Sequence, residues 1–283
     1  MRKRIRMAGF VLMAVLFLTA CRNPGKQKNP QEDKPEEAEL QVFLAASLNT
    51  AMAELSELWQ EQHPEVKIVC NAAGSGCLAA QIEEGCECDI FFSAAGKQMN
   101  QLEEKGLIVA GTRENVVKNQ VVVITRTGSG TKVKGLENLE AAASIALAGG
   151  SVPAGRYTRQ ALINLNRLEG ADDPSLITTE QVSEALGGVE ISEQDNVSKV
   201  LLAVAEGSCE VGTVYYSDIY GYEDKVEILQ IVEESLTGEV SYPVAQVVNP
   251  EAGEAQTAAA RDFISFLLSD TARSIFEKYY FIL

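Results

Sequence analysis

The sequence has very few of the residues that usually build a metal site or a hydrolytic centre. Its 283 residues include a single histidine, His63, which ends a helical pattern just before Pro64. Zinc sites commonly combine cysteines with histidines. A Ser-His-Asp centre would have to use His63, far from the strand ends at which the sites of open α/β sheets form. The sequence therefore argues against a bare metal ion and against a serine hydrolase.

Positive charge is also scarce. Lysine and arginine total 24 residues against 40 aspartates and glutamates, so the formal net charge is −16 at pH 7. A protein this acidic is repelled by the phosphate backbone of nucleic acids and by anionic membrane surfaces. We therefore expect no nucleic acid among its partners.

Cysteine is present in a number that leaves its pairing open. Beyond Cys21 near the N-terminus, the rest of the chain holds Cys70, Cys77, Cys86, Cys88 and Cys209. An odd count leaves at least one free thiol unless pairing is intermolecular. The Cys-x-Cys spacing at 86–88 is too tight for an unstrained bridge. Both a reduced state and one or two disulfides are compatible with this pattern.

The N-terminal segment has the pattern of an exported lipoprotein. Residues 1–20 combine a basic start with a short apolar stretch, which is typical of a signal peptide and too short for a comfortable membrane span. The stretch ends in the letters LTAC, which resemble a bacterial lipoprotein box, so we predict lipidation at Cys21. Residues 22–39 contain no large apolar side chain and cannot offset their ordering entropy. We predict that residues 21–39 are the lipidated cysteine and a flexible tether.

From Leu40 onward, the sequence alternates between buried-strand and helical patterns. Short apolar runs are followed by segments with apolar residues at helical spacing. In the first half the predicted strands are 40–47, 66–72 and 88–94, and the predicted helices are 50–62, 76–84 and 97–106. This alternation implies parallel strands with right-handed crossovers, and therefore an α/β fold.

The alternation restarts near residue 119 and indicates a second lobe. The predicted strands of this half are 119–125, 144–149, 211–216, 226–232 and 242–248, and the predicted helices are 154–165 and 196–207. Two amphipathic helices, 254–269 and 270–281, end the chain. We predict two α/β lobes joined by crossing strands, each a mostly parallel sheet flanked by helices. Lobe 1 comprises residues 40–121 plus 243–283, and lobe 2 comprises residues 122–242.

Small hydroxyl residues and helix starts occupy the ends of the predicted strands, where ligands bind in open parallel sheets. They are Ser47, Ser75 and Ser93-Ala94-Ala95 in the first half, and in the second half the segments GGSVPAGRY and EQDNVSK, which precede helices, and Tyr215. Each alone is explained by a helix cap, a turn or a core tyrosine. Together they offer hydroxyls and helix-starting N–H groups, which favour anions. No lysine or arginine recurs among them, so the set predicts an anion site of neutral donors.

Six motifs follow one another in an order that is specific, although each motif is weak alone. They are AASL, AGSGCLAAQIEEG, DIFFSA, VPAGRY, NVSKVLLAVAEGSCEVGTVYYSD and YPVAQVV. From about Leu40 to its C-terminus, the chain thereby resembles the periplasmic molybdate-binding proteins. The resemblance implies a two-lobed, type II periplasmic-binding-protein-like fold with a tetrahedral oxyanion in the interlobe cleft. The ligand-binding residues that it implies are Ser47, Ser75 and Ala94 from the first lobe, and Ala154, Val197 and Tyr215 from the second.

The resemblance also implies a transport function, without catalysis and without a cofactor. A receptor of this family, anchored outside the cytoplasm through Cys21, would bind molybdate or tungstate as a monomer. It would deliver the anion to an ABC permease driven by a cytoplasmic ATPase. The expected ligand suits the donor set, because a fully ionised dianion offers only hydrogen-bond acceptors.

Two alternatives remain open from the sequence. A receptor for another tetrahedral oxyanion, such as sulfate or thiosulfate, would use the same kinds of donors. From a different class, an exported serine hydrolase is suggested by residues 129–132, which read SGTK and match the S-x-x-K pattern. No S-D-N or K-T-G motif follows this match, which argues against the hydrolase.

Overall fold

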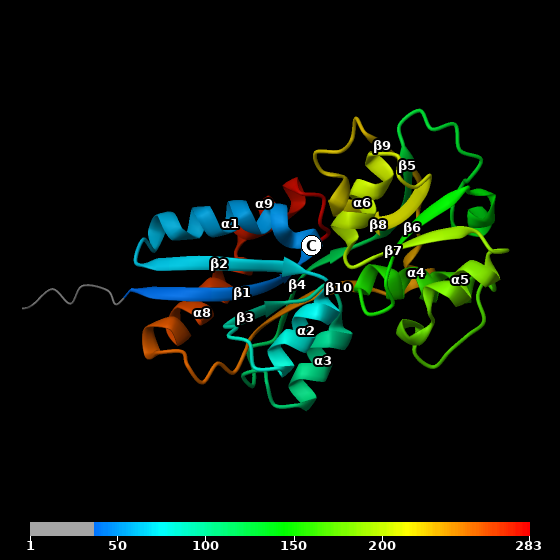
Figure 1. The fold of residues 1–283 in the computed structure, drawn as a ribbon. Helices are drawn as coiled ribbons and strands as arrows, with labels where there is room; N and C mark the ends of the chain where they lie inside the picture. Colours follow the sequence, from blue (N-terminus) through cyan, green and yellow to red (C-terminus); the bar gives the residue numbers. More distant parts are fainter. Residues whose placement is uncertain (1–36) are drawn as a thin grey trace, which may run out of the picture. The chain divides into compact units, whose positions relative to one another are not determined.

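Two five-stranded sheets organise residues 37–283, which are the residues that the computed structural model describes (Figure 1). The predicted signal peptide, the predicted lipidation site at Cys21 and most of the predicted tether lie outside these residues. Within the described residues, no helix has the length and apolar character needed to cross a membrane.

The first sheet has the strand order β2-β1-β3-β10-β4. Its strands are β1 (Ala38–Ala45), β2 (Val66–Ala73), β3 (Ile90–Phe92), β4 (Glu114–Asn119) and β10 (Val240–Gln246). β1 pairs in parallel with β2 and β3, whereas β10 is antiparallel to β3 and β4. The apolar run of β1 is nearly continuous because helices cover both faces of this sheet.

Helices cover the two faces of the first sheet as separate groups. One group is α1 (Asn49–Gln62), α8 (Glu254–Leu267) and α9 (Asp270–Lys278), and the other is α2 (Ser75–Glu83) and α3 (Gly96–Glu104). Neighbouring residues of β1 alternate between them: Phe43 packs with the α2 and α3 side chains, while Val42 and Leu44 belong to the larger core with α1 and α8. The period of two in β1 thus assigns its side chains to two different cores.

The second sheet has the strand order β7-β6-β8-β5-β9. Its strands are β5 (Val121–Arg126), β6 (Ser144–Ala148), β7 (Glu190–Gln194), β8 (Val211–Tyr215) and β9 (Val226–Ile231). Its helices are α4 (Pro153–Asn164), α5 (Thr179–Ala185), α6 (Val197–Ala205) and the short α7 (Glu234–Thr237). Within residues 37–283 there are also four 3-10 turns: η1 (Ala46–Leu48), η2 (Leu136–Ala141), η3 (Pro174–Leu176) and η4 (Tyr216–Ile219).

Helices α4 and α6 lie on opposite faces of the second sheet. Gly212 of β8 lies against Val200 and Val204 of α6, where an added Cβ would be 2.9 Å from both side chains. The next residue, Thr213, points to the other face, and its hydroxyl lies 2.9 Å from that of Thr158 on α4. Consecutive strand residues alternate between faces. β8 therefore packs against α6 on one face of the sheet and against α4 on the other.

The chain crosses from the first sheet to the second at Gln120, where the sequence pattern predicted no break. We predicted one strand over 119–125, but the structure has two, β4 and β5, separated at Gln120. β4 pairs with β10 in the first sheet, and β5 pairs with β8 and β9 in the second. The chain returns to the first sheet in β10. We refer to each sheet with its helices as a lobe.

The strand pairing corrects the prediction of mostly parallel sheets. In each sheet, two of the four strand pairings are antiparallel. The reason is that the crossing strands β4, β5 and β10 pass between the lobes instead of returning through a helix, so each can run against its neighbour. The sequence also failed to predict β7 and α5, whose residues are mostly exposed and lack a clear apolar period.

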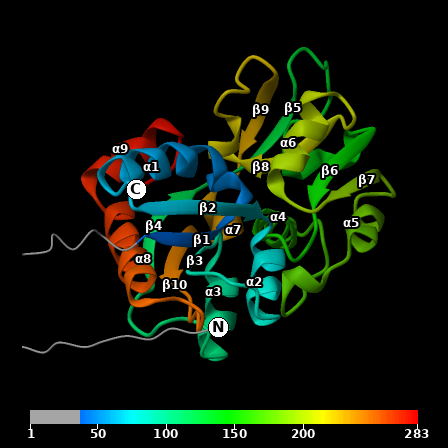
Figure 2. The same cartoon turned by 60° about the vertical axis from the view of Figure 1, so that its left-hand side comes forward.

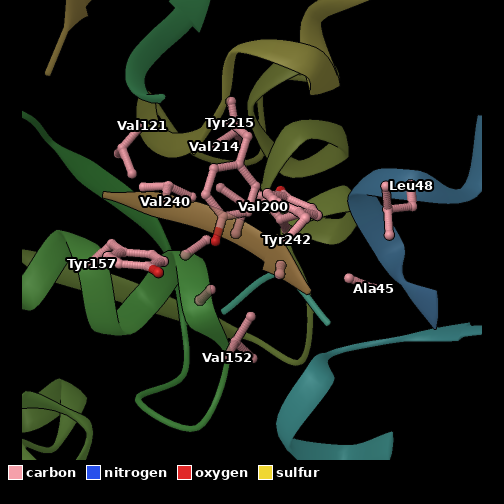
Figure 3. Close-up of a cluster of buried hydrophobic side chains, with 14 of the residues drawn as sticks. Ala45, Leu48, Val121, Val152, Tyr157, Val200, Val214, Tyr215, Val240 and Tyr242 are labelled. Atoms are coloured by element: carbon pink, nitrogen blue, oxygen red, sulfur yellow. The ribbon is translucent and has the colours of Figure 1, made fainter. Parts of the chain in front are cut away.

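The larger of the two cores contains buried apolar side chains from both lobes. Figure 3 shows part of it, with Ala45 and Leu48 from the first lobe facing Val152, Val200 and Tyr215 from the second. Because this core is continuous across the crossing strands, the two lobes are in contact rather than separated by solvent.

Candidate functional site

All six residues that were predicted to bind the oxyanion line one cavity between the lobes. Ser47, Ser75 and Ala94 come from the first lobe, and Ala154, Val197 and Tyr215 come from the second. The other lining residues are Ala45, Ala46, Ala73, Gly74, Val152, Pro153 and Asn196. Among these described residues, none carries a charged side chain.

The cavity is small. Its volume is about 10 Å³, and the empty space around it, including the part open to solvent, is about 200 Å³. Pockets for drug-sized organic ligands usually have about 300 to 1,000 Å³. The volume therefore suits a small ion better than a sugar or a peptide.

Three helices begin at the cavity wall. α2 begins at Ser75, α4 at Pro153 and α6 at Val197, and all three residues line the cavity. Figures 1 and 2 both show the starts of α2 and α4 meeting between the sheets. The first-turn N–H groups of a helix have no intrahelical acceptor, and the helix dipole places partial positive charge there. Three such ends around one small cavity favour an anion without any cationic side chain.

The two serine hydroxyls of the site are held by neighbours in the first lobe. Ser75 is only 1% exposed, and its Oγ accepts a hydrogen bond of 3.1 Å from the Ala94 N–H. Since that bond uses an oxygen lone pair, the hydroxyl proton of Ser75 is left to donate. The Oγ of Ser47 lies 2.9 Å from the Tyr242 hydroxyl. Ala94, which was also predicted to bind the ligand, directs its N–H at Ser75 Oγ in this structure.

Tyr215 supplies a buried hydroxyl that lacks a partner. Its OH is inaccessible to solvent and forms no hydrogen bond with any described residue. Burial raises the pKa of Tyr215 well above its ordinary value, so the phenol stays protonated and can donate. Its backbone N–H donates to Asp218 Oδ2 at 2.8 Å, and its ring lies edge-on to Tyr242 (Figure 3). An unpaired buried hydroxyl costs about 1 to 3 kcal/mol, and an acceptor in the cavity would remove that cost.

Asn196 is a lining residue that we did not single out from the sequence. It precedes α6, and its side chain accepts the Lys199 N–H at 3.0 Å as the N-cap of that helix. This bond fixes where α6 begins, and so where the Val197 N–H points. An asparagine directly before an apolar helical pattern is the signal that could have identified it.

One ion pair joins the lobes beside the cavity. Lys97 at the start of α3 donates from Nζ to Asp173 Oδ2 and to Ser175 Oγ in the second lobe, both at 2.5 Å. Desolvation raises the pKa of Asp173, but the hydrogen bonds from Lys97 and Ser175 outweigh it and lower this pKa to about 2. The carboxylate is therefore charged at all ordinary pH values, and the pair favours the closed arrangement of the lobes.

Neither a metal cluster nor a disulfide is present in the part of the chain that the structure describes. No group of three or more His, Cys, Asp or Glu side chains within 37–283 is arranged to hold a metal ion. The five cysteines of this part are all free thiols, with Cys88 and Cys209 buried. Burial raises the pKa of Cys88 well above its ordinary value, so this thiol stays protonated.

The fold and the cavity define a class of protein. Two α/β lobes joined by crossing strands, with a small cavity of neutral donors between them, are the architecture of a solute receptor that closes around its ligand. The chain belongs to the bacterial extracellular solute-binding proteins, whose family model matches residues 40–282.

Individual relatives cover nearly the whole chain. The molybdate-binding protein ModA of Haemophilus influenzae is 30% identical over 251 residues, which are 86% of this chain and 90% of that protein. YvgL of Bacillus subtilis, provisionally named an ABC transporter substrate-binding lipoprotein, is 27% identical over 95% of both chains. The solved substrate-binding domain of a provisionally assigned molybdenum ABC transporter from Clostridium difficile is 33% identical. It covers 87% of this chain and 99% of its own, with a TM-score of 0.61. The predicted two-lobed fold and the predicted resemblance to molybdate receptors are confirmed.

Proposed function

We propose that this protein is an extracytoplasmic receptor that captures molybdate or tungstate between its lobes and delivers it to an ABC permease. The observation that carries the proposal is the cavity itself. Three helix starts, two serine hydroxyls and the unpartnered Tyr215 hydroxyl surround one small cavity. In this proposal Ser47, Ser75, Ala94, Ala154, Val197 and Tyr215 bind the anion.

The chemistry of the lining supports a fully ionised dianion. Molybdate and tungstate offer only acceptor oxygens, and each charge-assisted hydrogen bond contributes about 1.5 to 3 kcal/mol. A protonated oxyanion such as hydrogen phosphate also needs an acceptor such as a carboxylate, which the described lining does not provide. The net charge of −16 opposes binding only weakly, because surface charges are screened within about 8 to 10 Å.

The remaining parts of the proposal concern location and partners. A lipid on Cys21 would hold the receptor at the outer face of the membrane, where a permease that is driven by a cytoplasmic ATPase receives the anion. The LTAC letters support this anchor, as does the lipoprotein name of YvgL. We propose that the receptor acts as a monomer.

An exported hydrolase finds no support at the residues that suggested it. His63 ends α1 and stacks on Trp59 with ring centres 4.0 Å apart, away from the cavity lining. Ser129, the serine of the S-x-x-K match, lies in the loop after β5, where its hydroxyl bonds to Thr125. Neither residue is placed to act as a nucleophile or base at the cavity, and we propose no catalytic activity.

Thermal melting with different oxyanions tests the proposed function. At about 100 times its Kd, a ligand adds about 2.7 kcal/mol of stability, which raises the melting temperature of a protein this size by roughly 5 to 11 °C. We expect this rise with molybdate and with tungstate, and a much smaller one with sulfate at equal concentration. Equal rises with molybdate and sulfate would instead favour a general oxyanion receptor, and no rise with any of them would contradict the proposal.

The interlobe ion pair gives a smaller, separate prediction. Lys97→Met should weaken molybdate binding by roughly 1.5- to 5-fold, because a partly exposed pair contributes about 0.2 to 1 kcal/mol and this one joins the lobes only when they meet. Isothermal titration measures the change. Since the pKa of Asp173 is lowered from 3.8, the contribution is complete above about pH 4 and is lost as the pH falls towards 2.

Lys105→Met is the matched control for this ion pair. Lys105 bonds to Glu83 at 2.7 Å with both partners in the first lobe, so it cannot hold the lobes together. We expect unchanged binding in this variant. Equal weakening in the two lysine variants would show that Lys97 acts through general charge rather than through lobe closure.

A further inference from the structure

The two glycines beside Ser75 bring the first lobe into direct contact with the backbone of the second. A Cβ added to Gly76 would lie 2.4 Å from the Ser151 carbonyl oxygen, and one added to Gly74 would lie 2.7 Å from the Asp195 carbonyl oxygen. Real Cβ atoms essentially never come within 3.0 Å of such an atom. The contacted atoms are main chain, so they cannot rotate away as a flexible side chain would.

Space, rather than backbone conformation, explains a glycine at these positions. Gly74 has φ −63° and ψ 133°, which any residue adopts, and Gly76 lies within the regular helix α2. A glycine inside a helix turn costs about 1 kcal/mol relative to alanine. Because glycine has no side chain, both positions allow the main chains of the two lobes to approach each other closely.

These contacts lie next to the cavity on both of its second-lobe walls. Ser151 comes two residues before Pro153, where α4 begins, and Asp195 comes two residues before Val197, where α6 begins. Gly76 therefore rests against the entry to α4, and Gly74 against the entry to α6. Ser75, between the glycines, faces the cavity that these helix starts enclose. These contacts thus limit how far the two lobes can close. They thereby fix the distance between the donors of the first lobe and those of the second.

We infer that Gly74 and Gly76 set the width of the oxyanion cavity and thereby the size of anion that it selects. This inference rests on the proposed function. Hydroxyls and helix N–H groups supply the attraction, but they would bind any tetrahedral dianion that reaches them all. Discrimination by size needs a stop that fixes how far the lobes close, and the backbone contacts of the two glycines provide it.

Alanine at the two positions tests the inference, with affinities for molybdate, tungstate and sulfate measured by isothermal titration. To reach 3.0 Å, Gly76→Ala has to separate the contact by at least about 0.6 Å, and Gly74→Ala by about 0.3 Å. We expect Gly76→Ala to weaken molybdate binding at least tenfold and to lower the molybdate-to-sulfate affinity ratio. The reason is that molybdate loses the hydrogen bonds that it can make only when the two lobes close fully around it. Gly74→Ala should show the same changes to a smaller extent. The molybdate-to-tungstate ratio should stay constant, because these anions are nearly equal in size.

Gly253→Ala is the matched control. Gly253 has φ −73°, and an added Cβ would meet no atom of the described chain within 4 Å, so binding should not change. The melting temperature of each unliganded variant separates a closure effect from a folding defect. If Gly76→Ala is destabilised without ligand, the binding measurements on Gly74→Ala, which requires a smaller displacement, test the inference.

The outcomes distinguish this inference from the proposed function. A wild type that binds neither molybdate nor tungstate contradicts the proposed function. A wild type that binds molybdate, with both alanine variants retaining its affinity and its preference over sulfate, overturns the inference alone.

Discussion

We expect Ser75→Ala to weaken molybdate binding by about 1.5 to 3 kcal/mol, which is roughly a 10- to 150-fold rise in Kd. The reason lies in the geometry of the hydroxyl. Ser75 Oγ is buried at the start of α2 and accepts the Ala94 N–H, so its proton is free to donate into the cavity. Alanine removes that hydrogen-bond donor, and a water molecule cannot easily replace it in the buried site. Isothermal titration with molybdate gives the affinity directly.

A second serine provides the control for this experiment. Ser56 lies on α1 and is also buried, but it does not line the cavity, and its hydroxyl has no hydrogen-bond partner among the described residues. Ser56→Ala should leave both binding and stability close to wild type. Wild-type affinity in Ser75→Ala, at an unchanged melting temperature, would remove Ser75 from the proposed site.

The largest loss of stability is expected from Arg159→Ala. Arg159 is fully buried on α4, yet none of the hydrogen bonds of its guanidinium within the described chain goes to a carboxylate. Its guanidinium donates to the carbonyl oxygens of Ile177, Ala148 and Gly155 and to Thr179 Oγ1, at 2.8 to 3.0 Å. These bonds tie α4 to the end of β6 and to the segment leading into α5. Each buried acceptor left unpaired costs about 1 to 3 kcal/mol, and the lost side chain adds a cavity.

We therefore expect Arg159→Ala to lower the free energy of unfolding by about 3 to 5 kcal/mol. Urea unfolding of the unliganded protein measures it. Arg261→Ala is the matched control, because Arg261 lies exposed on α8, and surface substitutions usually stay within about 0.5 kcal/mol. A loss below about 1 kcal/mol in Arg159→Ala would show that water or local rearrangement satisfies the four acceptors.

The parts of the fold that the sequence predicted are those with a strong local period. β1, α1, β2 and α2 were expected within two residues of their observed bounds, because buried strands read as apolar runs and helices show a spacing near 3.6. The split between β4 and β5 was missed because β4 has only two apolar residues, Val116 and Val117, and only the partners of the two strands in different sheets separate them. β7 was missed because its exposed edge carries little apolar signal.

The sequence by itself determined the kinds of donors at the site and the helix starts that present them. Hydroxyl residues after strands and proline at a helix entry are local features, and local hydrogen bonding and backbone conformation explain them. Only the tertiary structure decided that these positions meet. The approach of Gly76 to Ser151 and the bonds of Arg159 depend on how crossing strands and packed cores place distant segments. No periodic pattern records such distances, because they are set by the three-dimensional packing of both lobes together.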